Sequence, residues 1–202
     1  MFLMLVGLLF RSKGQFSRFL GGLSWYYLKM DFTIRAATPE DCIDIFRMTR
    51  ELSEYEKLSD QVKISLEDLK RNGFCQNPFY RCLIAEVPEE HKTKDGHVNV
   101  GYALFCYTYC TIKGKCVYLG DLYVMPEFRG KGIGKALMSS VAKVAKEQQC
   151  TNLQLSVLDW NTPSMDFYIA KGAQDLTKSE GWHSLRFHGA ALDKLAEEAP
   201  KN

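Results

Sequence analysis

The chain has 202 residues, of which 46% are hydrophobic and 25% are charged, and its formal net charge is +2. This length and composition suit a soluble domain with a buried core, and they exclude a disordered or fibrous protein. The small net charge provides no chain-wide positive field, so neither nucleic acid nor an acidic membrane surface is expected as a partner.

Residues 1–29 differ in composition from the rest of the chain. Met1–Phe10 is almost wholly apolar, basic residues follow it, and Asp31 is the first acidic residue. Ten apolar residues are too few to span about 30 Å of hydrocarbon, so stable membrane insertion is not expected. A secretory signal is not expected either, because it would carry its positive charge before the apolar run. We interpret residues 1–29 as a dispensable extension, with Met30 as the functional start and residues 30–202 as one domain. An organelle-targeting leader is the alternative.

The cysteines and histidines indicate a reducing compartment without a metal site. The seven cysteines are scattered, mostly in apolar segments, and form no CxxC pair. We therefore expect buried free thiols, as in a cytoplasmic protein. The four histidines have no ligand spacing with these cysteines, so no metal is expected.

The domain begins with a predicted strand and two helices. Phe32–Arg35 alternates as a short strand, and Thr38–Asp41 supplies an N-cap, a proline at the first helical position and an acidic first turn. The apolar face of the following helix comprises Cys42, Ile45, Met48, Leu52 and Tyr55. Ser65 caps a second short helix that ends near Gly73, and Phe79–Val87 predicts the next strand.

The middle of the domain predicts a long hairpin followed by a helix. Pro88–Gly96 is a polar connector, and Val98–Cys110 and Cys116–Met125 are apolar, aromatic-rich strands joined by a turn. A helix is expected from about Ile133 to Gln148, and Asn152–Leu158 predicts another strand.

The last part predicts a helix, a strand and a helix. The first helix begins near Pro163 and ends at Gly172, whose position suits a left-handed C-cap. Trp182–His188 predicts the last strand, and Ala190–Glu198 predicts a terminal helix. Hairpins followed by strand-helix-strand units imply an α/β fold, in which helices flank both faces of a mixed central sheet.

A glycine-rich loop, Arg129-Gly130-Lys131-Gly132-Ile133-Gly134, is the most informative segment. Three glycines within five residues separate a predicted strand from a predicted helix. A helix start presents unpaired N–H groups and the positive end of its dipole, and glycines permit close approach, so a phosphorylated ligand is expected here. The spacing does not match a P-loop, and the late position does not match a dinucleotide fingerprint.

The pattern Arg129-x-x-Gly132-x-Gly134 instead resembles the pyrophosphate-binding pattern of the GNAT superfamily of acetyltransferases. The resemblance covers nearly all of residues 31–197. The segments that resemble its diamine (spermidine/spermine) acetyltransferases are Arg35–Cys42, Asn77–Tyr80, Tyr118–Met125, Asp159–Asn161, Met165–Tyr168, Gly172–Leu176 and Glu180–Trp182. Within that family, Glu56–Ser65 and Val157–Asn161 are most similar to the thialysine N-acetyltransferases.

The resemblance implies a GNAT fold and a direct acetyl transfer from acetyl-CoA to a primary amine of a small substrate, either thialysine or a polyamine such as spermidine or spermine. It also implies a homodimer. Tyr168 matches the tyrosine that donates a proton to the departing CoA thiolate. The alternative is that Tyr168 is only a packed helical aromatic residue.

The resemblance also implies where acetyl-CoA binds. The residues concerned are Leu122, Tyr123, Val124, Arg129, Gly130, Lys131, Gly132, Ile133, Gly134, Lys135, Asn161, Thr162, Pro163, Ser164 and Lys171. Asn161 and Pro163 are also explained as a helix N-cap and first turn, and Lys171 suits the negative end of a helix dipole.

The implied acceptor side contains acidic and polar residues, as a cationic amine requires. Tyr55 and Glu56 match the substrate-contacting pair of the family. The other residues expected there are Gly120, Asp121, Gln154, Leu155 and Ser156.

Gly120 departs from the family pattern, in which a glutamate at this position contacts the amine and helps to deprotonate it through water. Positioned acid–base groups typically contribute about 10²–10⁴-fold to a rate. Three hypotheses follow: Asp121 or a water chain replaces the glutamate, the enzyme prefers a different acceptor, or the chain is a weakened acyl-CoA-binding paralogue with a regulatory or protein-interaction role. Acetylation of proteins or peptides is a further alternative with the same fold and donor.

Overall fold

The computed structural model describes residues 30–200, so the predicted extension at residues 1–29 lies outside the described part. One mixed five-stranded sheet has the order β1-β2-β3-β4-β5. Its strands are β1 (Thr33–Ala36), β2 (Arg81–Glu86), β3 (Asn99–Cys110), β4 (Gly114–Val124) and β5 (Asn152–Leu155). Neighbouring strands are antiparallel from β1 to β4, whereas β5 is parallel to β4.

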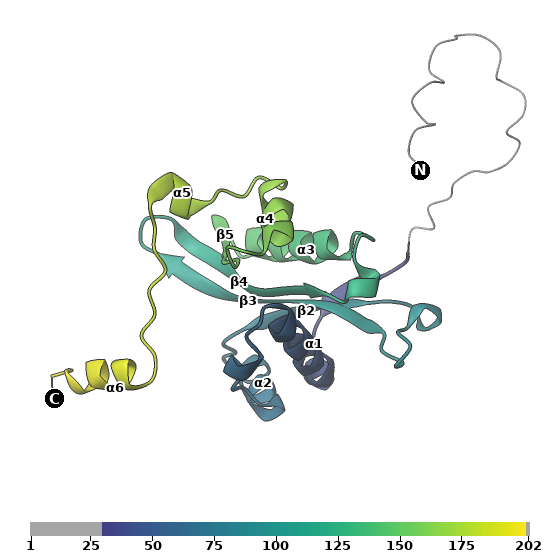
Figure 1. Cartoon of the computed structure of the whole chain (residues 1–202), viewed down its shortest axis with the longest axis horizontal. Helices are drawn as coiled ribbons and strands as arrows, with labels where there is room; N and C mark the ends of the chain where they lie inside the picture. Colours follow the sequence, from purple (N-terminus) through teal and green to yellow (C-terminus); the bar gives the residue numbers. More distant parts are fainter. Residues whose placement is uncertain (1–29, 201–202) are drawn as a thin grey trace, which may run out of the picture.

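Helices cover both faces of this sheet, which confirms the predicted α/β architecture (Figure 1). Helices α1 (Cys42–Tyr55) and α2 (Leu66–Gly73) lie on one side, and α3 (Ile133–Glu147) and α4 (Thr162–Ile169) lie on the other. Helices α5 (Leu176–Glu180) and α6 (Ala190–Glu197) follow on a C-terminal arm. No helix among residues 30–200 is long and apolar enough to cross a membrane.

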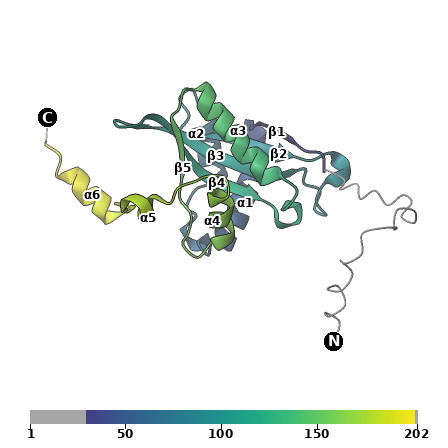
Figure 2. The ribbon, with the colours of Figure 1, turned by 90° about the horizontal axis from the view of Figure 1, so that it is seen from above.

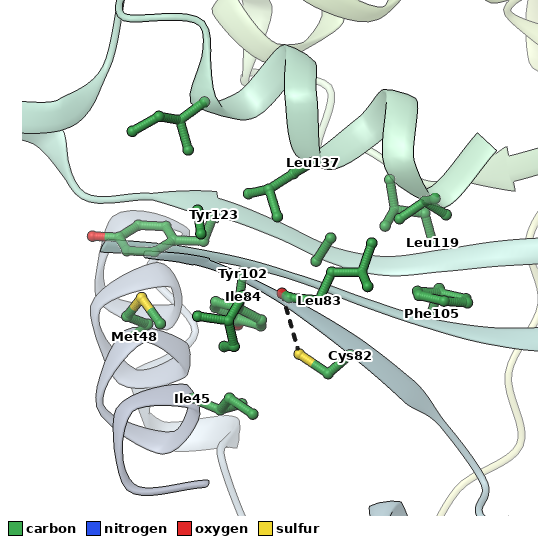
Figure 3. Close-up of a cluster of buried hydrophobic side chains, with 14 of the residues drawn as sticks. Ile45, Met48, Cys82, Leu83, Ile84, Tyr102, Phe105, Leu119, Tyr123 and Leu137 are labelled. Carbon is green, nitrogen blue, oxygen red and sulfur yellow. Dashed lines mark hydrogen bonds between the residues drawn. The ribbon is translucent and has the colours of Figure 1, made fainter. Parts of the chain in front are cut away.

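The core fills both faces of the sheet (Figure 3). Ile45 and Met48 of α1 pack on the side of Tyr102, whereas Leu137 of α3 packs on the opposite side, and none of these four side chains is exposed. Burying a side chain of this size stabilises the fold by about 1.5–3 kcal/mol. The predicted apolar face of α1 is therefore confirmed in its first three turns, while Tyr55 at its end is 39% exposed.

Two predicted helix starts are confirmed by their hydrogen bonds. The backbone N–H of Thr38 donates to the Asp41 carboxylate at 2.7 Å, although a short 3₁₀ turn precedes α1. At α2, Ser65 and Asp68 form a reciprocal capping box, with bonds of 3.0 and 3.1 Å. Arg35 joins this scaffold from β1, because its guanidinium contacts Asp41 at 2.6 Å.

A β-bulge at Gly120 interrupts the pairing of β4. Leu104 faces Asp121 and Phe105 faces Leu119, so Gly120 has no cross-strand partner on β3. Pairing of β4 with β5 also ends here, at Leu119 and Leu155. A bulge bends its strand and increases the local twist. The second half of β4 therefore diverges from β5 and leaves an unpaired edge.

The same divergence makes β5 shorter than the predicted strand Asn152–Leu158. The predicted strand Trp182–His188 is wrong, because this segment forms no strand and lies on the arm that extends away from the sheet (Figure 2). Its apolar side chains are solvent-exposed, with values of 63% for Trp182, 88% for Leu185 and 61% for Phe187. Alternating apolar residues predict pairing, but no strand of this chain pairs with the segment within residues 30–200. The terminal helix is confirmed as α6, and α5 was not predicted.

The cysteines are all free thiols, as predicted. Four are buried, namely Cys42, Cys82, Cys116 and Cys150, whereas Cys75 is exposed and the other two are intermediate.

Candidate active site

A cleft of about 410 Å³ opens where β4 and β5 diverge. Its walls come from the end of α1, the second half of β4, the glycine loop, the segment after β5, and α4. The predicted site residues that line it are Tyr55, Glu56, Gly120, Asp121, Leu122, Tyr123, Val124, Arg129, Gly130, Gly132, Gly134, Lys135, Ser156, Asn161, Pro163, Ser164 and Tyr168. The fold thus gathers residues that are more than 100 positions apart into one cavity.

The glycine loop lines the cleft and has the backbone geometry of an anion cradle. Gly130 and Gly132 have φ angles of 74° and 90°, in the left-handed region that glycine adopts without a steric penalty. Gly132 is the N-cap of α3, whose first turn contains no acidic residue. The first N–H groups of a helix have no partner within it, and Lys135 adds a positive charge. These features fit a pyrophosphate group.

Six predicted site residues do not line the cleft, and the packing accounts for three of them, Gln154, Leu155 and Ile133. The six are Gln154, Leu155, Lys131, Ile133, Thr162 and Lys171. Gln154 and Leu155 lie within the paired part of β5, and the Ile133 side chain is buried in the core. The ammonium groups of Lys131 and Lys171 lie 4.9 and 4.6 Å from the ring centroids of Phe128 and Phe167.

Four apolar residues of the cleft were not predicted as site residues: Leu52, Phe128, Val157 and Phe167. Leu52 lies one helical turn before Tyr55 and Glu56, so helical spacing could have identified it. The other three adjoin predicted site residues and carry no separate signal in the sequence.

Arg129 holds the glycine loop against the end of β4. Its Nε donates a 2.8 Å hydrogen bond to the carbonyl oxygen of Val124. Its guanidinium carbon also lies 5.5 Å from the ring centroid of Tyr55 and 5.7 Å from that of Tyr123. The side chain therefore connects three walls of the cleft.

Asn161 connects α4 to α1. Its Oδ1 accepts hydrogen bonds from the Ser164 backbone N–H at 3.4 Å and from the Tyr55 hydroxyl at 3.2 Å. The first bond confirms the N-cap interpretation of Asn161, which is 5% exposed. Trp160 packs beside this link, with its ring 5.7 Å from that of Tyr55.

Tyr168 faces the cleft from α4. Burial, with a smaller contribution from the charge of Glu56, raises the pKa of Tyr168 to about 12. The hydroxyl is therefore protonated at neutral pH and is available as a proton donor. Phe167 packs against it with an interplanar angle of 71°, so Tyr168 is both packed and accessible.

Two carboxylates, those of Glu56 and Asp121, also line the cleft. Burial raises the pKa of Glu56, and the charge of Asp121 adds to this effect. Burial also raises the pKa of Asp121, although a hydrogen bond from the Tyr102 hydroxyl opposes the shift. Each carboxylate would be stabilised by a cation between them.

Gly120 leaves space beside these carboxylates. A Cβ at this position would approach only Leu104, at an ordinary contact distance of 3.6 Å, and the φ angle of Gly120 is not positive. No backbone or packing constraint therefore requires glycine here. Among residues 30–200, no group of three or more His, Cys, Asp or Glu residues is arranged to hold a metal ion.

Comparison with known proteins is consistent with this geometry. Residues 45–172 match the model of the Acetyltransferase (GNAT) family. The chain is 53% identical to thialysine N-epsilon-acetyltransferase of Bos taurus, over 81% of this chain and 96% of that protein. It is 38% identical to spermidine/spermine N(1)-acetyltransferase-like protein 1 of Homo sapiens, over 83% of this chain and 24% of that protein.

Among solved structures, an integron cassette protein from the mobile metagenome of V. cholerae superimposes with a TM-score of 0.66 at 26% identity. The superposition covers 84% of this chain and 99% of that one.

Proposed function

The chain belongs to the GNAT family of acetyltransferases, and we propose that it acetylates a primary amine of a small cationic substrate, thialysine or a polyamine such as spermidine or spermine. One observation carries the proposal: a single cleft is lined by the glycine loop at the start of α3, by Tyr168, and by the carboxylates of Glu56 and Asp121. Acetyl-CoA, the donor that the family uses, supplies an acetyl thioester and a pyrophosphate.

On the donor side, the N–H groups around Gly132 and Lys135 would bind the pyrophosphate. The unpaired edge of β4 from Leu122 to Val124 would bind the pantetheine arm with main-chain groups, in the manner of an added strand. The same main-chain groups would orient and polarise the thioester carbonyl. Orientation of this kind supplies much of the rate in a direct transfer.

On the acceptor side, Glu56 and Asp121 would attract an ammonium group. The amine must lose one proton before its nitrogen can attack the thioester carbon. As the carbon–sulfur bond breaks, the Tyr168 hydroxyl would protonate the departing sulfur. The amide nitrogen then loses its remaining extra proton to the Tyr168 oxygen through solvent, so one proton is released in the whole reaction.

We also propose that the protein acts as a cytoplasmic homodimer. Two features of residues 30–200 lack a partner. The arm exposes the side chains of Trp182, Leu185 and Phe187, and the outer edge of β5 pairs with no other strand. An apolar strand-like segment and an open sheet edge support pairing between copies. Sedimentation at micromolar concentration is expected to give a dimer, and a monomer would contradict this proposal. The free thiols support a reducing compartment.

Release of free CoA thiol by the full chain, measured with acetyl-CoA and a panel of amines, tests the function. Thialysine, spermidine and spermine are expected to react faster than an uncharged-tail amine such as butylamine, because only the former group carries a second charge. A protein that binds CoA but gives no turnover above the uncatalysed rate with any amine would overturn the proposed enzyme activity.

A further inference from the structure

A chain of two hydroxyl groups and one carboxyl group, with the buried Tyr102 at its centre, ends at Asp121. The Tyr102 hydroxyl donates to Asp121 Oδ2 at 2.9 Å and lies 3.0 Å from Thr49 Oγ1. Tyr102 on β3 has no exposed surface, so water cannot replace either contact. The chain of groups therefore joins α1, β3 and β4 directly beneath the cleft.

The hydrogen-bond direction in this chain follows from the charge of Asp121. An ionised carboxylate only accepts, so the single proton of Tyr102 is donated to Asp121, and Thr49 must donate to the Tyr102 oxygen. When Asp121 is protonated, both bonds can reverse, and the carboxyl then donates to Tyr102. The buried tyrosine thus keeps two hydrogen bonds in either charge state, which avoids the cost of an unpaired buried hydroxyl.

Asp121 is well placed to accept a proton from a bound amine. It lines the cleft, and within residues 30–200 its Oδ1 makes no hydrogen bond, which leaves that oxygen open to a ligand. The neighbouring Gly120 contributes no acid or base. Glu56 is the other carboxylate of the cleft, and it makes no hydrogen bond that would orient its side chain among the described residues.

We propose that Tyr102, supported by Thr49, is a positioning residue that holds Asp121 as the proton acceptor for the substrate ammonium. This inference rests on the proposed function. One N–H bond of the ammonium breaks, its proton bonds to Asp121 Oδ1, and the nitrogen lone pair becomes free to attack the thioester carbon. Asp121 later returns the proton to solvent.

The groups facing Asp121 define the expected pH effect. They are Tyr102 from β3, Cys82 from β2 and Glu56 from the end of α1. Burial and the nearby negative charge keep the Cys82 thiol protonated by raising its pKa. Loss of the Tyr102 hydroxyl would remove the one contact that lowers the pKa of Asp121. The carboxylate would then lose its charge at a higher pH.

The test compares Tyr102→Phe with the wild type and with Tyr80→Phe. The control removes the partly buried phenol hydroxyl of Tyr80, which donates a 2.8 Å hydrogen bond to the Leu69 carbonyl and does not line the cleft. The first measurement is the pKa of Asp121, from ¹³C NMR of labelled aspartates, with Asp121→Asn used to assign its signal. The second is the acidic limb of the plot of kcat/KM against pH. Tyr102→Phe is expected to move both upward by about one pH unit, as for a charge-assisted hydrogen bond.

Thr49→Val is expected to produce a smaller shift in the same direction, and Thr49→Ser should restore the wild-type behaviour. This pair also tests the proposal if Tyr102→Phe does not fold. The positioning role would be overturned if the pKa of Asp121 were unchanged in folded Tyr102→Phe. If Tyr102→Phe does not fold, an unchanged pKa in Thr49→Val would overturn it. If the pKa of Asp121 changed but the acidic limb of kcat/KM against pH did not, the role of Asp121 as proton acceptor would be overturned. Absence of turnover in the wild type would instead overturn the proposed function, while the NMR titration would still test the coupling.

Discussion

The Tyr55 hydroxyl donates a 3.2 Å hydrogen bond to Asn161 Oδ1, which closes one side of the cleft between the end of α1 and the start of α4. Tyr55→Phe removes this link but keeps the aromatic ring. We expect KM for the amine to rise about 2- to 12-fold, because a typical hydrogen bond contributes about 0.5–1.5 kcal/mol. Steady-state kinetics at saturating acetyl-CoA would measure it. An unchanged KM in a folded variant would show that the link does not contribute to binding.

Gly120→Glu should introduce a third carboxylate into the acceptor side without disturbing the fold. We expect kcat/KM for thialysine or a polyamine near pH 7 to rise by up to about 10²-fold, since a positioned acid–base group contributes at least this much in other sites. Gly120→Gln is the control for size without charge. An unchanged or lower value for both substrates, with thermal stability intact, would remove position 120 from the mechanism.

Tyr168→Phe should lower kcat by about 10²–10⁴-fold while leaving CoA binding nearly unchanged. The group must be protonated to act, so its contribution is present below its pKa of about 12 and is lost only as the pH rises through that value. The wild type should therefore show no alkaline decline due to Tyr168 below about pH 10. Single-turnover rates with saturating acetyl-CoA would test both points. A wild-type kcat in the variant would mean that Tyr168 is only a packed residue.

Gly132→Ala should weaken acetyl-CoA binding by about 5- to 30-fold, because a Cβ in the left-handed region costs about 1–2 kcal/mol and would shift the loop. No atom lies within 4 Å of that Cβ, so the effect would come from the backbone and not from a clash. Gly96→Ala is the matched control. Gly96 has a φ of 86° and equally open surroundings, but it lies in the polar connector. Calorimetric titration with CoA should detect weakening only in Gly132→Ala, and equal affinities in all three proteins would contradict the cradle.

Asp41→Asn should lower the free energy of unfolding at pH 7 by about 1–3 kcal/mol, because Arg35 would lose a charged hydrogen-bond partner. Hydrogen bonds from Arg35 are the main reason that the pKa of Asp41 falls from 3.8 to about 2. A lowered folded-state pKa gives stability that is fully present above the unfolded value and is lost as the pH falls through the folded value. The difference between wild type and variant, measured by urea unfolding, should therefore shrink from about pH 4 to about pH 2. A difference that does not depend on pH would contradict this assignment.

The backbone geometry of the glycine loop could be predicted from the sequence because it is local. Gly130 and Gly132 occupy the backbone conformation that makes glycine necessary, and the helix begins directly after them. The hydrogen bond between Tyr55 and Asn161 could not be predicted, since it joins residues 106 positions apart and depends on how α1 and α4 meet. The Thr49–Tyr102–Asp121 chain was missed for the same reason.

The sequence pattern was misleading where the structure depends on strand pairing. Trp182–His188 has the alternation of a strand, but alternation describes only the segment and not whether an edge is available to it. Lys131 and Lys171 also have suitable charge and position along the chain, and in the structure their ammonium groups lie beside the rings of Phe128 and Phe167. Charge can be predicted from sequence, whereas the direction of a long side chain depends on its neighbours.

The bulge at Gly120 has an evolutionary consequence. A side chain on an ordinary ladder position is constrained by its opposite number on the next strand, so a change there disturbs the sheet. Gly120 has no such partner on β3, and a Cβ there would make only ordinary van der Waals contact with Leu104. Under the proposed function, a substitution at this one residue would therefore change acceptor preference while leaving the sheet pairing and the glycine loop unchanged. On the same proposal, the acceptor side and the donor side of the cleft could change independently of each other.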